Sequence, residues 1–124
     1  MSLLSGLLGN ASGIDLKQLN KDYGTFLISN EEIVAGFKLI RDQFVFTNKR
    51  IIFVNKQGLT GSKVEHLTIP YSKISMFSKE NAGMLDLDCE IKLWVVGHSS
   101  PITMSFRKGE NIDTVYKLLS QAIL

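Results

Sequence analysis

Basic side chains beside two predicted turns are the residues of this chain whose types and spacing best suit binding chemistry. Lys38 and Arg41 lie at one turn, and Lys49 and Arg50 lie in the next. Ammonium and guanidinium groups bind phosphate and carboxylate groups through charge-assisted hydrogen bonds. These four residues are therefore candidates for binding an anionic ligand, either a phosphate group or an acidic peptide. A basic sheet edge exposed to water gives the same pattern, and we prefer that interpretation.

The residues that usually bind metals are poorly placed to do so here. His66 and His98 are far apart and have no cysteine or second histidine at ligand spacing. Acidic residues alternate from 86 to 90 at a spacing that suits a hard cation, but Lys92 continues the same row. We expect no metal site and no cofactor.

Potential nucleophiles are equally unconvincing. Ser99 and Ser100 follow His98 directly, and neighbouring residues in a turn rarely aim at each other. Cys89 is expected on the buried face of a strand, where it behaves as a small apolar side chain. As the one cysteine it cannot form an intramolecular disulfide, which fits a reducing compartment. We predict no catalytic residue and no enzymatic activity.

Trp94 is a large aromatic residue on an otherwise polar strand face, in line with Glu90 and Lys92. Isolated aromatic residues of this kind are typical of the central contacts of protein interfaces. We therefore predict that Trp94, Lys92 and Glu90 contribute to a contact between copies of the chain. Trp94 lying beneath the N-terminal segment is the alternative.

The N-terminal leucines Leu3, Leu4, Leu7 and Leu8 form one stripe of a short helix. This stripe has three possible partners: its own subunit, a neighbouring subunit or a membrane surface. The membrane is disfavoured because no Lys or Arg precedes Lys17. We include these leucines among the predicted interface residues.

Hydrophobic alternation predicts seven strands to position these residues. The clearest strand covers residues 85–95, including Cys89 and Val95. Apolar and polar residues alternate strictly along it, so one face is expected to be buried and the other exposed to solvent. The segment 51–54 is apolar on both faces, as in a central strand. The predicted strands cover residues 32–39, 43–46, 51–54, 64–69, 74–78, 85–95 and 102–106.

Helical periodicity appears at both ends of the chain. Residues 3–11 and 13–22 predict two short helices, the second with Leu16, Leu19 and Tyr23 facing inward. After residue 110 a longer amphipathic helix is predicted. Its inward residues are expected to be Ile112, Val115, Tyr116, Leu119, Ala122 and Ile123.

Length and composition restrict the class of protein. A chain of 124 residues with 44% hydrophobic residues suits one globular domain, and a net charge of +2 spread along it does not favour nucleic-acid binding. No apolar stretch is long enough to span a membrane, and the N-terminus lacks the basic region of a signal peptide. We expect a cytoplasmic protein.

Two segments of the sequence carry a family resemblance. Arg41-Asp42 followed by residues 47–53 (Thr-Asn-Lys-Arg-Ile-Ile-Phe), together with residues 69–74 (Ile-Pro-Tyr-Ser-Lys-Ile), resembles the bacterial pleckstrin-homology (PH) domain family, formerly a family of unknown function. The Thr-Asn-x-Arg run is shared more loosely with GRAM-type relatives of the fold. The resemblance covers roughly residues 31–123.

The resemblance implies a mainly β, split barrel of four plus three antiparallel strands that a C-terminal helix caps. It also implies a helical N-terminal extension (1–30) before the PH-like domain (31–124), with one domain overall. Symmetric, ring-like homo-oligomers and no enzymatic activity go with the family. We therefore expect the chain itself as the main partner, with another cytoplasmic protein as a further one.

Eukaryotic relatives of this fold hold phosphoinositide headgroups with basic residues of the first hairpin. Lys38 and Arg41 fit that pattern, but Gln43 stands where an arginine is expected, and Asp42 reduces the local positive charge. Lipid binding is therefore disfavoured. Two hypotheses remain: a self-associating, non-catalytic module, and a binding domain for an anionic ligand at the basic hairpin ends.

Overall fold

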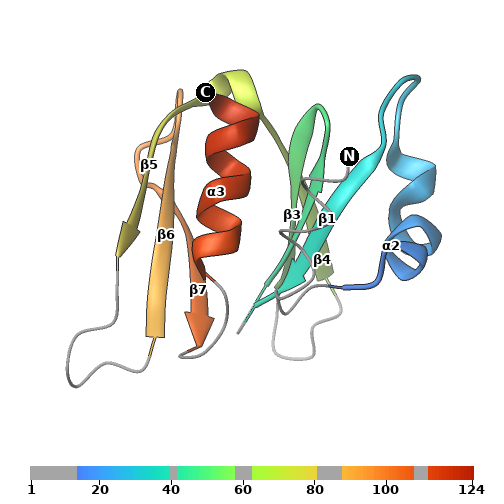
Figure 1. The fold of residues 1–124 in the computed structure, drawn as a ribbon, viewed down its shortest axis with the longest axis horizontal. Helices are drawn as coiled ribbons and strands as arrows, with labels where there is room; N and C mark the ends of the chain where they lie inside the picture. The colour runs from blue at the N-terminus through green and yellow to red at the C-terminus, as the bar shows by residue number, and fades with distance from the viewer. Residues whose placement is uncertain (1–13, 40–41, 58–62, 81–87, 108–111) are drawn as a thin grey trace. The chain divides into compact units, whose positions relative to one another are not determined.

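The computed structural model describes residues 14–39, 42–57, 63–80, 88–107 and 112–124 (Figure 1). Seven strands and a C-terminal helix confirm the predicted mainly β class, with four strands in one antiparallel sheet and three in another. The chain divides into two compact units, which meet in sequence between Pro70 and Tyr71. Each unit is described separately below.

The first unit holds the four-stranded sheet, whose strands follow one another in sequence order. The strands are β1 (Ile33–Lys38), β2 (Gln43–Thr47), β3 (Arg50–Gln57) and β4 (Lys63–Pro70). β3 pairs along its whole length with β4, from Arg50 opposite Pro70 to Gln57 opposite Lys63. Ile51 and Ile52, which point to opposite faces of the sheet, are both buried.

Helix α2 (Leu16–Tyr23) and the 3-10 turn η1 (Gly24–Phe26) precede this sheet, and α2 packs against β1 (Figure 1). Leu19 is fully buried and lies directly over Gly36 of β1: a Cβ atom at residue 36 would stand 2.6 Å from Leu19 Cδ2. The N–H of Ile14 donates to the Gly36 carbonyl at 2.9 Å. Glycine therefore allows close approach of the helix to the strand.

The buried residues under α2 come from every part of this unit up to β3. They are Leu19, Tyr23, Ile33, Val45, Ile52 and Val54. Aromatic residues alternate with these along the strands and so occupy the opposite face. Phe37 packs edge-on to Phe46, and Phe44 stacks on Phe53 with ring centroids 4.7 Å apart. Both faces of the sheet are thus apolar, although only one carries a helix of this unit.

The second unit contains η2 (Tyr71–Lys73), β5 (Ile74–Glu80), β6 (Asp88–Val95), β7 (Ile102–Arg107) and the helix α3 (Ile112–Ile123). The strand order is β5-β6-β7, so β6 is the middle strand. Helix α3 packs against β6 (Figure 1). On β5, Phe77 meets Tyr116 edge-on, and Lys79 Nζ lies 2.6 Å from Asp113 Oδ1. These contacts attach α3 to one face of the three-stranded sheet.

Several details differ from the predictions. Leu16 is 44% exposed, because α2 makes only two turns and buries Leu19 and Tyr23 instead. Helix α3 buries Thr114 and Leu118 and leaves Tyr116 at the rim, since its contact stripe is rotated toward these residues. Cys89 is half-buried.

The predicted helix at residues 3–11 lies outside the described residues, as do residues 85–87 of the sixth predicted strand. The other predicted strands are present. β3 and β5 are longer than expected, because their polar ends also pair with a neighbouring strand.

Candidate interaction surface

Arg50, the first residue of β3, forms an ion pair with Glu31 rather than extending into water. Its Nε lies 2.8 Å from Glu31 Oε2, and its Nη2 lies 3.0 Å from Glu31 Oε1. The Glu31 side chain is fully buried, and Arg50 is one-fifth exposed. A two-point contact between a guanidinium and a carboxylate is the strongest common geometry for such pairs.

The turn between β2 and β3 adds further hydrogen bonds to the same segment. Thr47 Oγ1 donates to Glu31 Oε2 at 2.7 Å. Asn48 accepts from the Glu32 N–H at 2.9 Å and donates to the Asn30 carbonyl at 2.9 Å. We call Glu31, Thr47, Asn48 and Arg50 the Arg50 clasp. The clasp joins the chain that enters β1 to the β2–β3 turn.

Hydrogen bonding strongly lowers the pKa of the Glu31 carboxyl. Burial by itself raises this pKa, but hydrogen bonds from Arg50, from Thr47 and from the Ile28 N–H, together with the positive charge of Arg50, lower it to about 2. The ion pair is therefore present at any pH well above that value. Every buried side-chain nitrogen and oxygen among the described residues has a partner, so the clasp is internally complete.

The clasp explains the Thr-Asn-x-Arg run as a folding motif. Three of its four residues hold the segment before β1, and Arg50 also donates to the carbonyl of Phe26 and to Thr68 Oγ1. All three guanidinium nitrogens thus have protein partners. Arg50 was proposed from sequence as an anion-binding residue, and the anion it contacts in this structure is Glu31.

The remaining anion-binding candidates are not brought together. Lys38 stands opposite Gln43, at the first residue of β2, whereas Lys49 follows Thr47, the last residue of β2. The four steps from Gln43 to Thr47 correspond to about 13 Å of extended chain. Both lysines are exposed, and Arg41 lies outside the described residues. The two hairpin ends therefore present separate charges.

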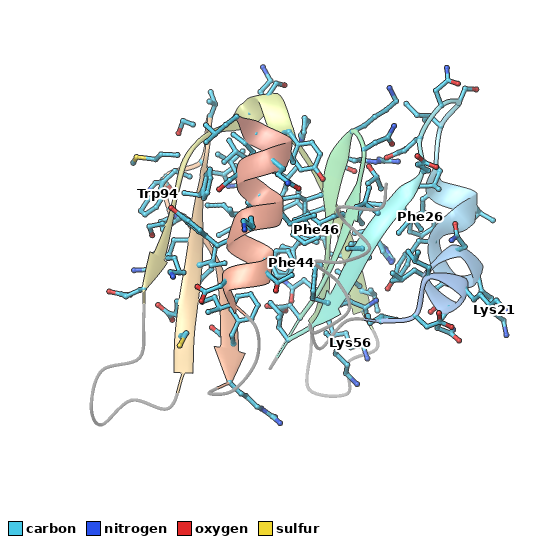
Figure 2. All side chains as sticks on the ribbon, in the orientation of Figure 1. Lys21, Phe26, Phe44, Phe46, Lys56 and Trp94 are labelled. Atoms are coloured by element: carbon cyan, nitrogen blue, oxygen red, sulfur yellow. The ribbon has the colours of Figure 1, made fainter. Side chains whose placement is uncertain are left out.

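Trp94 lies on the outer face of the three-stranded sheet, the face away from α3 (Figure 2). Met76 of β5 is its direct cross-strand neighbour and is 57% exposed. Val96, two residues after Trp94, is 63% exposed. We call Met76 and Trp94, together with Val96 in the turn that follows β6, the Trp94 patch. The strand alternation therefore predicted the face of Trp94 correctly, and the Trp94 side chain itself is half-buried.

Charged side chains continue the same face beyond the patch. Lys92 is two residues before Trp94 on β6, and its Nζ lies 4.0 Å from Glu80 Oε2. Glu80 and Glu90 are cross-strand partners, and like charges directly opposite each other destabilise a sheet. The predicted interface residues Trp94, Lys92 and Glu90 therefore do share one face. The predicted partners Leu3, Leu4, Leu7 and Leu8 lie outside the described residues.

An aromatic group on the four-stranded sheet was not anticipated from sequence. Phe26 of η1 packs edge-on to His66 of β4 at 4.9 Å, and Tyr23 lies close to both rings. Gln43 donates to the Tyr23 hydroxyl at 3.0 Å. Burial, with a contribution from the negative charge of Asp22, raises the pKa of Tyr23. Phe26 and His66 are 40 positions apart in the sequence, so their contact becomes apparent only in the folded chain.

Within the described ranges, no three His, Cys, Asp or Glu side chains gather in a way that could hold a metal ion. The helices of those ranges are also too short and too polar for any of them to cross a bilayer.

Comparison with known proteins shows close similarity along nearly the whole chain. Residues 2–123 match the family model described as the bacterial PH domain. The uncharacterized protein YjqA of Bacillus subtilis (strain 168) is 45% identical over 121 residues, which are 97% of each chain.

Two solved structures from Shewanella are similar in fold and sequence. A DUF1696 family protein with a pleckstrin-homology domain from Shewanella loihica PV-4 superposes with a TM-score of 0.81 and is 39% identical, covering 94% of this chain and 99% of its own. A pleckstrin homology domain from Shewanella amazonensis SB2B has a TM-score of 0.81 and 40% identity, covering 98% of both chains.

Proposed function

Because this chain belongs to the bacterial PH domain family, we propose that it is a non-catalytic PH-like module whose copies associate through the outer face of the β5-β6-β7 sheet. The single observation that supports this most is the Trp94 patch. Met76 and Trp94 are cross-strand neighbours on a strand face that is otherwise polar, and the exposed Val96 follows in the turn after β6. Exposed apolar areas with a polar surround are typical of protein contacts.

The position of β6 restricts the kind of contact. As the middle strand, β6 pairs on both sides, with β5 and with β7, so its backbone groups are already used. Another copy therefore cannot add a strand to β6, and the contact has to use side chains. Lys92 and Glu90 then lie at the rim, where charges govern specificity more than affinity.

The proposal includes the leucine stripe at residues 3–8 as a second part of the interface. Those residues carry no charge, so burying them against another copy leaves no unpaired ion. The assembled protein would act as a cytoplasmic scaffold for other proteins.

Mass measurement tests the self-association directly. Size-exclusion chromatography with light scattering should give a discrete oligomer for the wild-type chain. Trp94→Asp should weaken association at least about thirtyfold, because a central aromatic contact typically contributes 2 kcal/mol or more. Trp94→Phe should retain most of the association.

Leu124→Asp is the charge control, because it places the same negative charge at a residue that is 96% exposed and distant in sequence from the patch. It should associate like the wild type. A wild-type monomer, or a Trp94→Asp variant with the wild-type mass, would remove the proposal.

The anion-binding alternative would have to rest on a single hairpin end. Lys49 is the exposed cation at the β2–β3 turn, with Arg50 already bonded to Glu31. If such a site exists, inorganic phosphate should raise the melting temperature of the wild type but not of Lys49→Glu. Equal behaviour of the two chains would exclude this site.

A further inference from the structure

The methionines of the described ranges differ sharply in exposure. Met104 of β7 is fully buried, whereas Met76 of β5 is 57% exposed. Met1 and Met84 lie outside the described residues. Peroxides oxidise the thioether sulfur of methionine, and a buried sulfur is protected from them. Met76 is therefore the methionine of these ranges that an oxidant in solution can reach.

The pairing of β5 with β6 places Met76 beside Trp94. The two residues are direct cross-strand partners, so their side chains leave the sheet on the same face. The register of β5 shifts between Ile74 and Met76, and the Ser75 hydroxyl at this irregularity donates to the Trp94 carbonyl at 3.1 Å. Trp94 itself is half-buried, so Met76 and Val96 are the more exposed members of the Trp94 patch.

We infer that Met76 is a redox-sensitive modification site: a peroxide oxidises its sulfur and thereby weakens the contact between copies, and reduction of the sulfoxide restores the contact. The inference rests on the self-association proposed above and gives that contact its regulation. The reactant class is a peroxide, because the reaction needs an oxidant that accepts two electrons and supplies the oxygen atom of the sulfoxide.

The chemical step balances with hydrogen peroxide as the co-reactant. A lone pair of the Met76 sulfur attacks one peroxide oxygen, so an S–O bond forms while the O–O bond breaks. The sulfur is oxidised by two electrons, the peroxide is reduced by two, and water leaves after a proton moves to the departing oxygen. In the reverse direction a reductase removes the oxygen as water and a dithiol is oxidised to a disulfide.

A sulfoxide at residue 76 changes what the contact would have to bury. The thioether is apolar, whereas the sulfoxide is polar. Burial of a polar group without a hydrogen-bond partner is unfavourable, so oxidised Met76 favours the separate, hydrated chain. A contact that covers Met76 would in turn slow its oxidation. Oxidation and association therefore oppose each other.

Peroxide treatment of the full chain at low protein concentration, where separate chains prevail, tests this inference. Peptide mass spectrometry should then find an added oxygen atom on Met76 and none on Met104. Light scattering after size-exclusion chromatography should show an association constant at least about tenfold lower than that of the untreated chain. Methionine sulfoxide reductase with a dithiol should restore the wild-type mass. Met76→Gln, which places a polar amide at the same residue, should associate weakly without peroxide.

Met76→Leu is the matched control, because leucine has a similar volume and no sulfur. This variant should assemble like the wild type and should keep its oligomer after peroxide treatment. It retains Cys89 and Trp94, so it also shows whether oxidation at other residues affects the assembly. Circular dichroism should confirm that the treated chains and both variants are folded.

The outcomes separate the two proposals. The redox site is overturned if Met76 stays unmodified, if a chain oxidised at Met76 associates like the untreated one, or if peroxide dissociates Met76→Leu equally. Each of these results leaves self-association through Trp94 standing. An untreated wild-type monomer, or a Trp94→Asp variant that keeps the wild-type mass, overturns the self-association itself.

Discussion

Arg50 donates to both carboxylate oxygens of Glu31, at 2.8 and 3.0 Å, across 19 positions of sequence. Replacing Arg50 with leucine would leave a buried carboxylate without its counter-ion. We expect Arg50→Leu to lower the free energy of unfolding by about 3 kcal/mol. Urea denaturation should show this as a lower midpoint with an unchanged slope.

Two further variants identify the cause of that loss. The double variant Glu31→Leu with Arg50→Leu should recover part of the stability, because no unpaired charge stays buried. Lys49→Ala, at the neighbouring exposed lysine, should stay within about 0.5 kcal/mol of the wild type. Equal losses for Lys49→Ala and Arg50→Leu would contradict the role of the ion pair.

Acid should weaken the protein through Glu31. The pKa of this carboxyl is about 2 in the folded chain and has an ordinary value of 4.5. Since the folded-state pKa is the lower one, the contribution to stability is complete above pH 4.5 and is lost as the pH falls toward 2. Urea denaturation of the wild type and of Glu31→Gln, each between about pH 5 and about pH 2, measures this loss of stability.

The Glu31→Gln variant should be less stable than the wild type at neutral pH and should lose less stability on acidification. Glu32→Gln, at the exposed neighbouring residue, should follow the wild-type curve. Parallel curves for wild type and Glu31→Gln would show that other carboxyl groups account for the acid sensitivity.

Gly36 leaves no room for a side chain beneath Leu19. A Cβ atom there would lie 2.6 Å from Leu19 Cδ2 and 2.7 Å from Cδ1, and Leu19 is fully buried. We expect Gly36→Ala to cost about 1 to 3 kcal/mol of stability, as overpacking usually does. Combined with Leu19→Ala, the loss should be smaller than the sum of the two single losses. Additive losses would mean that the two residues do not compete for space.

Salt should weaken self-association only moderately. The charged side chains beside the Trp94 patch are at the surface, where salt screens them, whereas the apolar contact is not screened. Between about 0.05 and about 0.5 M NaCl we expect the association constant to fall less than about tenfold. Sedimentation equilibrium at several salt concentrations measures this. An association constant that rises steeply with salt would instead indicate that charges repel each other across the contact.

Local patterns were sufficient to predict the strands and the C-terminal helix. The alternation from Cys89 to Val95 identifies a strand with one wet face, because that pattern depends only on the two-residue period of extended chain. It also identifies the sheet face on which Trp94 lies, where the side chain is half-buried. The side chains facing inward from short helices were harder to predict. Leu16 fits the helical period, but a two-turn helix has too little length to bury it.

Contacts between distant residues could not be predicted from such patterns. Glu31 and Arg50 look like ordinary surface charges in the sequence, and only the register of β1, β2 and β3 brings them together. Gly36 did give a signal, since a glycine within a strand often marks a close approach of other chain atoms. The contact of Phe26 with His66 gave none, because it depends on how η1 passes over β4.

The Arg50 clasp has a consequence for shortened versions of this protein. A chain that begins at Glu31 would keep the ion pair but would lose the Ile28 N–H, the Phe26 carbonyl and the Asn30 carbonyl, which bond to Glu31, Arg50 and Asn48 respectively. It would also lose Leu19 and Tyr23 from the apolar cluster on the sheet. Truncation just before Glu31 would therefore remove several of the backbone groups that are hydrogen-bonded to the Arg50 clasp.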